Sequence, residues 1–324
     1  MSAAPSSPHP ASPETIARMG QILEAQKRAN LREGPPSAAK RKDWLNRCIG
    51  LLINHQDEII AALNADFGAR SKEMSALADI AGSIGPLKHA RDNLERWMKS
   101  ERRKVDPPAL ALFGAKAEVR FQPKGVIGII SPWNFPVNLT FAPLAGVIAA
   151  GNRAMIKPSE FTPETSALMA RLFDLVFEED EIAVITGGPD VGGAFARLPF
   201  DHLVFTGGTS IAYHVMRAAA ENLTPLTLEL GGKSPVIVGR SADIQKTAAR
   251  VMAGKTMNAG QICLAPDYAI LPKEKRDDFV SAAQAAATKM YPTIKDNPDY
   301  TAIINQRHFE RIQGLVADAR AKGA

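Results

Sequence analysis

A glycine-flanked loop, 258–267 (NAGQICLAPD), carries Cys263, one of the two cysteines of the chain. A cysteine thiol can attack a carbonyl carbon, and a thioester formed on it hydrolyses more readily than an ester would. Cysteine is also common as a small apolar side chain packed in a protein core. The loop by itself favours the second interpretation, so other polar residues must be weighed with it.

A carboxylate stands near the end of an apolar segment, 225–232 (PLTLELGG), where Glu229 precedes Leu230 and two glycines. Because glutamate is almost never buried without a partner, a core strand explains Glu229 poorly. A raised pKa at this position would suit a general base that activates water against a thioester. A helix cap or a salt bridge is the alternative role.

An amide follows another apolar segment, 125–131 (GVIGIIS), after which the chain reads Pro132, Trp133 and Asn134. The Asn134 side chain can donate a hydrogen bond to an oxyanion that develops beside the Cys263 backbone N–H. Asparagine before Phe-Pro is also typical of a turn, and this alternative stays open.

These polar residues follow short apolar segments that alternate with helical patterns. The segment 125–131 is β-branched and bounded by glycine, as a buried parallel strand is. Four more strand patterns follow, each preceded by a helical one: RAMIKPS, IAVITGG, HLVFTGG and PLTLELGG. This alternation predicts an α/β fold with a doubly wound parallel sheet, which binds ligands outside the carboxyl ends of its strands. The notable polar residues fall there: Asn134, Lys157, Glu160, Gly207 and Glu229.

Two further regions flank the predicted sheet. Residues 13 to about 100 read as helices, and 115–123 (AKAEVRFQP) alternates like a half-buried strand. The helical stripe expected to be buried comprises Leu45, Ile49, Leu52, Ile53, Ile59, Ile60 and Leu63, with Cys48 as a structural neighbour. Beyond residue 232 the sequence predicts two strands and three helices, which are few elements for a complete α/β domain.

Composition excludes several classes of protein. The 324 residues, 45% hydrophobic and 23% charged, are typical of an ordinary soluble protein with room for two domains. No apolar run reaches the about 20 residues that span a bilayer, and the N-terminus has no secretory signal. Residues 1–12 predict a disordered tail. Two cysteines indicate a reducing compartment, which we take as the cytoplasm.

Neither nucleic acid nor metal is an expected ligand. The net charge of +5 is scattered, and its densest cluster, 99–104 (KSERRK), lacks aromatic residues, so a solvated helix end explains it better than nucleic-acid binding. The histidines are dispersed, which argues against a zinc site.

Five short pieces at the predicted strand ends and in the cysteine loop carry a resemblance. They are PWNFP (132–136), KPSE (157–160), FTGGT (205–209), LELGGKSP (228–235) and GQIC (260–263). In this order they resemble the aldehyde dehydrogenase superfamily over roughly residues 13–324. The longer loop GQICLAPDY and the helical N-terminal part are more similar to the branch of class 3, fatty-aldehyde and coniferyl-aldehyde dehydrogenases.

The resemblance implies NAD(P)-dependent oxidation of an aldehyde to the carboxylic acid through a thiohemiacetal and a thioester. It makes Cys263 the nucleophile, Glu229 the general base and Asn134 the oxyanion donor. It assigns the cofactor to Pro132, Trp133, Lys157, Glu160, Gly207, Gly208, Leu230 and Gly231. A carboxylate at position 160 would repel a 2′-phosphate, so NAD is favoured and NADP remains possible. The segment KPSE can also begin a helix with Ser159 as its cap. The substrate implied is a hydrophobic or aromatic aldehyde, coniferaldehyde among them.

The resemblance also sets expectations about organisation. It implies an NAD-binding domain at 13–231, with a bridging hairpin near 103–125, and an incomplete catalytic domain at 232–324. Family members continue further, so we expect a C-terminally truncated chain, and a homodimer for the full-length protein. Two departures bear on phosphate binding: Gly208 stands where serine is usual, and Ala212 where a second glycine is frequent.

Two alternative functions remain open. One is a non-catalytic dinucleotide-binding fragment or pseudoenzyme. The other is an acylating enzyme that passes the thioester to coenzyme A; such enzymes typically lack the general-base glutamate, so Glu229 disfavours it.

Overall fold

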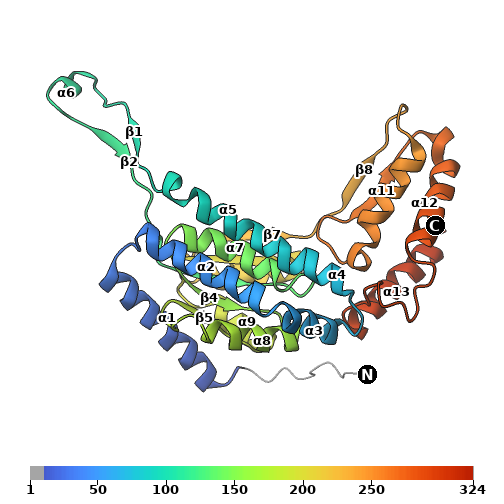
Figure 1. The fold of residues 1–324 in the computed structure, drawn as a ribbon, viewed down its shortest axis with the longest axis horizontal. Helices are drawn as coiled ribbons and strands as arrows, with labels where there is room; N and C mark the ends of the chain where they lie inside the picture. The colour runs from blue at the N-terminus through green and yellow to red at the C-terminus, as the bar shows by residue number, and fades with distance from the viewer. Residues whose placement is uncertain (1–10, 324) are drawn as a thin grey trace.

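A five-stranded parallel sheet forms the centre of the molecule in the computed structural model, which describes residues 11–323 (Figure 1). Its strands, in the spatial order β5-β4-β3-β6-β7, are β3 (Val126–Ile130), β4 (Arg153–Lys157), β5 (Ile182–Val184), β6 (His202–Gly207) and β7 (Leu226–Leu230). They are connected by α7 (Asn138–Ala149), α8 (Pro163–Asp174), α9 (Pro189–Ala196) and α10 (Thr209–Ala220). Every neighbouring pair runs parallel, which confirms the predicted doubly wound α/β sheet.

Helices cover both faces of this sheet. The N-terminal helices are α1 (Pro13–Glu33), α2 (Ala38–Asn54), α3 (Gln56–Phe67), α4 (Lys72–Met74) and α5 (Gly82–Trp97). Because alternate strand residues point to opposite faces, Ile127 and Ile129 pack with α2, α3, α5, α7 and α8. Val126 and Leu203 pack on the other face with α1, α9 and α10. The sheet is thus buried between two apolar layers, which explains the continuous apolar character of β3.

The predicted helical region contains two deviations. Between α4 and α5 the chain forms a π-helix, η1 (Ser75–Ala81), where a plain α-helix was expected. The predicted buried stripe is right for Leu45, Ile49 and Leu52 but wrong for Ile53, whose side chain is 54% exposed. Ile53 lies about 100° further round α2 than Leu52, just beyond the arc that the buried residues of this helix occupy, so its side chain is left uncovered. Cys48 is completely buried, as predicted.

A hairpin projects away from the sheet (Figure 1). Its strands β1 (Glu101–Arg103) and β2 (Ala117–Val119) pair antiparallel, with α6 (Ala109–Leu112) between them. The predicted half-buried strand over 115–123 is wrong: only three residues form a strand, and Glu118 and Val119 are exposed. A hairpin that leaves the body of the protein cannot bury one face of its strands against it.

A second, smaller parallel pair follows the main sheet. It consists of β8 (Ser234–Ile237) and β9 (Pro266–Ile270), and α11 (Ile244–Thr256) packs against α12 (Arg276–Met290) beside it. The remaining elements are η2 (Met257–Gly260), η3 (Lys273–Lys275) and α13 (Gln306–Ala321). This order agrees with the strands and helices expected beyond residue 232.

The chain ends add two observations. Residues 1–10 of the expected tail lie outside the described residues, whereas Ser12, which was also assigned to the tail, caps α1 by accepting a hydrogen bond from the Thr15 N–H at 3.1 Å. Between residues 11 and 323, no helix has the length and apolar character required to cross a membrane.

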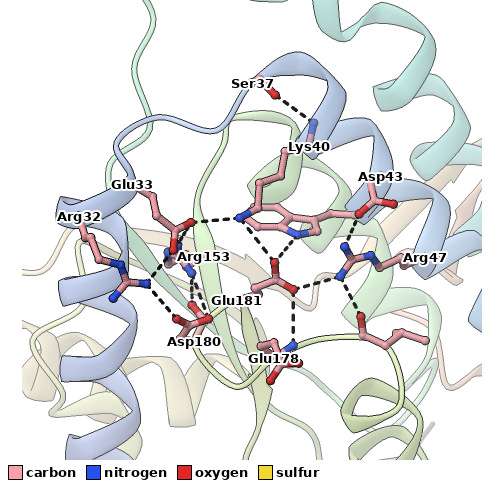
Figure 2. Close-up of polar contacts among 12 residues, drawn as sticks. Arg32, Glu33, Ser37, Lys40, Asp43, Arg47, Arg153, Glu178, Asp180 and Glu181 are labelled. Atoms are coloured by element: carbon pink, nitrogen blue, oxygen red, sulfur yellow. Dashed lines mark hydrogen bonds and ion pairs between the residues drawn. The ribbon is translucent and has the colours of Figure 1, made fainter.

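A network of charged side chains fastens α1 and α2 to the sheet (Figure 2). Glu181, which precedes β5, accepts hydrogen bonds from the Trp44 Nε1 at 3.0 Å and the Arg47 Nη1 at 3.1 Å. Glu33, at the end of α1, pairs with Lys40 of α2 at 3.0 Å and with the buried Arg153 of β4 at 2.8 Å. The two carboxylates therefore join both helices to neighbouring strands.

The Glu33 carboxylate makes stability depend on acidity. Its hydrogen bond from Lys40, with help from Arg32 and Arg153 and against a desolvation effect, lowers the Glu33 pKa from 4.5 to about 2. Because the pKa of Glu33 is lower in the folded protein, its carboxylate stabilises the fold at pH values above the unfolded pKa of 4.5. This contribution disappears as the pH falls towards the folded pKa of about 2. We expect Glu33→Gln to lose less stability than the wild type between neutral pH and about pH 3, measured by thermal unfolding.

The difference should be below about 1 kcal/mol, because Glu33 is partly exposed and water screens the pairs. Glu24→Gln, an exposed glutamate on the same helix, is the control and should follow the wild type. An acid-induced loss in Glu33→Gln as large as in the wild type would contradict the assignment.

Candidate active site

The predicted strand-end residues lie along one edge of the sheet. β3, β4, β6 and β7 are parallel, and their residues pair in register, with Ile130 beside Lys157 and Gly207 beside Leu230. Parallel strands present all their carboxyl ends at the same edge. The candidates gathered there are Pro132, Trp133, Asn134, Lys157, Glu160, Gly207, Gly208, Glu229, Leu230 and Gly231.

The Cys263 loop comes to this edge from the other part of the chain. It lies between η2 and β9, and Cys263 is exposed, which contradicts the interpretation as a buried structural cysteine. The Asn134 Nδ2 donates to the Gln261 carbonyl at 3.0 Å. A Cβ atom added to Gly232 would lie 4.0 Å from the Cys263 carbonyl oxygen. The segments carrying Asn134 and Glu229 are therefore both next to the cysteine loop.

The backbone immediately before the cysteine takes an unusual course. Asn258, Ala259 and Gly260 have φ angles of 49°, 53° and 75°, three successive left-handed conformations. Residues other than glycine adopt this region at a cost, and such strain concentrates at functional sites. Packing around the buried Asn258 must hold this turn in place.

The Asn134 side chain already has a structural task. Of the two N–H groups that its amide offers, one donates to Gln261, which leaves the other free to serve an oxyanion. Its backbone carbonyl accepts from the Arg70 Nη1 at 2.9 Å and from the Asn258 Nδ2 at 3.1 Å. Through these contacts the Asn134 segment is joined both to Arg70 of the N-terminal helical region and to the cysteine loop.

Glu229 lies in a different environment from the one the sequence suggested. It is exposed, because β7 is an edge strand whose Leu228 and Leu230 face the core while Glu229 faces the opposite side. Its carboxylate therefore lacks the apolar surroundings that the sequence suggested. The side chain is nevertheless open to water at the edge that holds Cys263.

The cofactor candidates form two groups along the edge. Lys157 is buried, and its Nζ pairs with the Glu160 Oε2 at 2.8 Å. The alternative role of Ser159 as a helix cap is not seen, since α8 begins after Thr162. Gly207 is required by a close approach, because a Cβ there would come 2.5 Å from the Phe205 ring.

The start of α10 forms the second group. Gly208 is its N-cap residue, with no side-chain hydrogen bond to the helix and open space where a Cβ would be. Backbone N–H groups at the start of a helix bind phosphate well.

His308 is a site neighbour that no sequence pattern singled out. It lies on α13, and its ring centroid is 5.0 Å from that of Trp133 and 5.8 Å from that of Phe161. Burial lowers the His308 pKa, and the nearby Arg311 and Arg307 add to this effect. A helix at the far end of the described chain therefore covers part of the same edge, which no local pattern could indicate.

Comparison with known proteins gives one consistent result. Residues 15–324 match the group described as "Aldehyde dehydrogenase family". A probable coniferyl aldehyde dehydrogenase of Caulobacter vibrioides is 67% identical over 306 residues, which make up 94% of this chain and 63% of that protein. The coniferyl aldehyde dehydrogenase of a Pseudomonas species is 53% identical over the same shares of both chains. The chain spans 63% of the length of these relatives.

Solved structures agree in fold. The substrate-bound state of Staphylococcus aureus AldH has a TM-score of 0.87 and 36% identity, covering 93% of this chain and 65% of that one. An aldehyde dehydrogenase of Mycobacterium tuberculosis complexed with NAD+ has a TM-score of 0.82 and 26% identity, covering 95% of this chain and 64% of that one.

The two thiols should differ sharply in reactivity. Cys263 is exposed, whereas Cys48 is completely buried and burial raises its pKa, so little thiolate forms there. Titration of the folded protein with a disulfide reagent is expected to modify Cys263 alone, and Cys48 only after denaturation. Cys263→Ala should remove the rapid reaction and Cys48→Ala should leave it intact; a rapid reaction that survives in Cys263→Ala would contradict the assignment.

Proposed function

The chain belongs to the aldehyde dehydrogenase family, and from this we propose that it carries the nucleophile, general base and oxyanion donor for the oxidation of an aldehyde to a carboxylate. The observation that carries the proposal is the convergence of the Asn134, Glu229 and Cys263 segments at one edge of the sheet. NAD(P), when bound, accepts the hydride that leaves the substrate.

Each of the three residues has a separate role. The Cys263 thiolate attacks the aldehyde carbonyl, which yields a thiohemiacetal and, after hydride loss, a thioester on the sulfur. The second amide N–H of Asn134 and the backbone N–H of Cys263 donate to the oxyanion. Glu229 then takes a proton from water, whose oxygen attacks the thioester and releases the acid.

The cofactor would lie across the strand ends. Lys157 would donate to the adenosine ribose and Glu160 would accept from its hydroxyls, so that NAD is preferred and NADP remains an option. The N–H groups that follow Gly208 would hold the pyrophosphate, since no side chain occupies them. The remaining lining residues are Pro132, Trp133, Gly207, Leu230 and Gly231. A structural neighbour at 26% identity was solved with NAD+ bound, which supports NAD as the cofactor.

The relatives support a substrate class. Two of them are named for coniferyl aldehyde, so we propose an aromatic aldehyde of this kind as the substrate. We further propose that residues 13–231 act as the NAD-binding domain and that 232–324 belong to the catalytic domain. A homodimer in the cytoplasm is the proposed assembly and location of the full-length protein.

A second candidate is a dinucleotide-binding protein without turnover. The exposure of Glu229 on an edge strand favours it, because an uncovered base is not held against the thioester. Calorimetric binding of NAD with no NADH formed from any aldehyde would support this candidate over the first.

The enzymatic proposal predicts different defects for its two central residues. With NAD and coniferaldehyde, the wild type should form NADH, and Cys263→Ala should lower kcat by at least about 10³-fold. Glu229→Gln should keep a rapid first burst of NADH but lose about 10²–10⁴-fold in steady turnover, because the thioester forms and is not hydrolysed. Ordinary turnover by Cys263→Ala would refute the mechanism. Glu221→Gln, an exposed glutamate after α10, is the control.

A further inference from the structure

A buried ion pair lies beneath the candidate site. Arg70 and Asp79 are paired through the Arg70 Nη2, and both side chains are completely shielded from solvent. The Arg70 guanidinium lies over two aromatic rings, 4.5 Å from the centroid of Phe67 and 5.1 Å from that of Phe135. These two ring contacts and the paired carboxylate together restrain the orientation of the planar guanidinium.

Both members of the pair make hydrogen bonds to the segment that carries the oxyanion donor, Asn134. The Arg70 Nη1 donates to the Asn134 carbonyl at 2.9 Å. The Asp79 Oδ1 accepts from the backbone N–H groups of Val137 and Asn138, each at 3.1 Å, at the start of α7. The turn is thus held at two points by the two members of one pair.

The π-helix accounts for the position of Asp79. Asp79 lies in η1, where the helix is wider than an α-helix, and such segments are frequent at functional sites. A Cβ added to the neighbouring Gly82 would come 2.8 Å from the Asn138 Nδ2, so these two segments lie close together. The N-terminal helical layer therefore approaches the Asn134 turn closely at this point.

The Asn134 carbonyl, which accepts from Arg70, also accepts a hydrogen bond from the cysteine loop. The Asn258 Nδ2 donates to the Asn134 carbonyl at 3.1 Å and to the Gln261 carbonyl at 3.3 Å. The Gln261 side chain is fixed in turn by Asn258 and by Ala302, with its Nε2 3.0 Å from each carbonyl. Asn258 also begins the left-handed turn before Cys263, so its position sets the course of the loop.

We propose that the buried Arg70–Asp79 pair is the positioning element of the catalytic loops. Arg70 fixes the Asn134 carbonyl, and Asn258, which donates to the same carbonyl, fixes the segment carrying Cys263 relative to it. The pair touches neither substrate nor cofactor, so its effect falls on the geometry of attack and oxyanion binding. This inference rests on the proposed function for its kinetic consequence, but its structural consequence can be measured without turnover.

The main test compares Arg70→Lys with the wild type. Lysine keeps the charge beside Asp79 but cannot donate to Asp79 and Asn134 in one rigid plane. We expect the rate of the first NADH burst to fall about 10- to 100-fold, because small displacements of reacting groups have effects of this size. KM for NAD should stay unchanged. Hydrogen exchange of the backbone amides in 257–265 should become faster.

A second variant covers the case in which Arg70→Lys does not fold. Asn258→Gly removes the amide contacts while glycine accepts the left-handed backbone, and it should show the same slower burst and faster exchange. Arg41→Lys is the matched control: Arg41 is also buried and donates to backbone carbonyls of Pro36 and Ala149, yet it lies away from the cysteine loop. It should lower stability without changing the burst or exchange in 257–265.

The outcomes separate the two proposals. A wild type that forms NADH, with burst and exchange unchanged in both Arg70→Lys and Asn258→Gly, would overturn the positioning role and leave the proposed function standing. If the wild type forms no NADH, the proposed function fails, and faster exchange in 257–265 of both variants would still support the positioning role.

Discussion

Parallel pairing of the central strands is the constraint on which the rest of this structure depends. Hydrogen bonds in register between β3, β4, β6 and β7 place four chain segments at one edge, although they are spread over about a hundred residues. Two of these strands, β4 and β6, end in residues that cannot continue the apolar core, Lys157 and Gly207. The active-site candidates are neighbours because the sheet permits no other arrangement of its carboxyl ends.

The buried Arg70–Asp79 pair holds the Asn134 turn, which the hydrogen bonds of the sheet do not reach. Burial raises the Asp79 pKa, and Arg70 and two backbone N–H groups oppose that rise, so the carboxylate is surrounded by donors. Removing one member of a buried pair generally costs about 3–5 kcal/mol, because the other charge stays without a partner. A pair this costly to disrupt is a stable base for the Asn134 turn. The surface network around Glu33 and Glu181 fastens helices instead, and its partial exposure makes it weaker.

The two cysteines show how surroundings assign roles to one residue type. Cys48 is surrounded by apolar side chains of α2 and its neighbours, where a thiolate is disfavoured. Cys263 follows a strained turn and is exposed next to the edge of the sheet where the carboxyl ends of the strands lie.

The errors in the sequence-based expectations also come from the surroundings of the residues. Ile53, Glu118 and Glu229 all have plausible local patterns, but the faces they occupy are uncovered.

The sequence by itself determined the strand and helix order, the α/β class and the candidate residues Cys263, Glu229 and Asn134, because apolar periodicity and short motifs are local properties. It could not reveal the Arg70–Asp79 pair, the contact of His308 with Trp133 or the exposure of Glu229. Those features depend on which elements meet in space, and residues far apart along the chain give no periodic signal of their contact. Only the tertiary structure decided them, since burial and pairing are properties of the packed molecule.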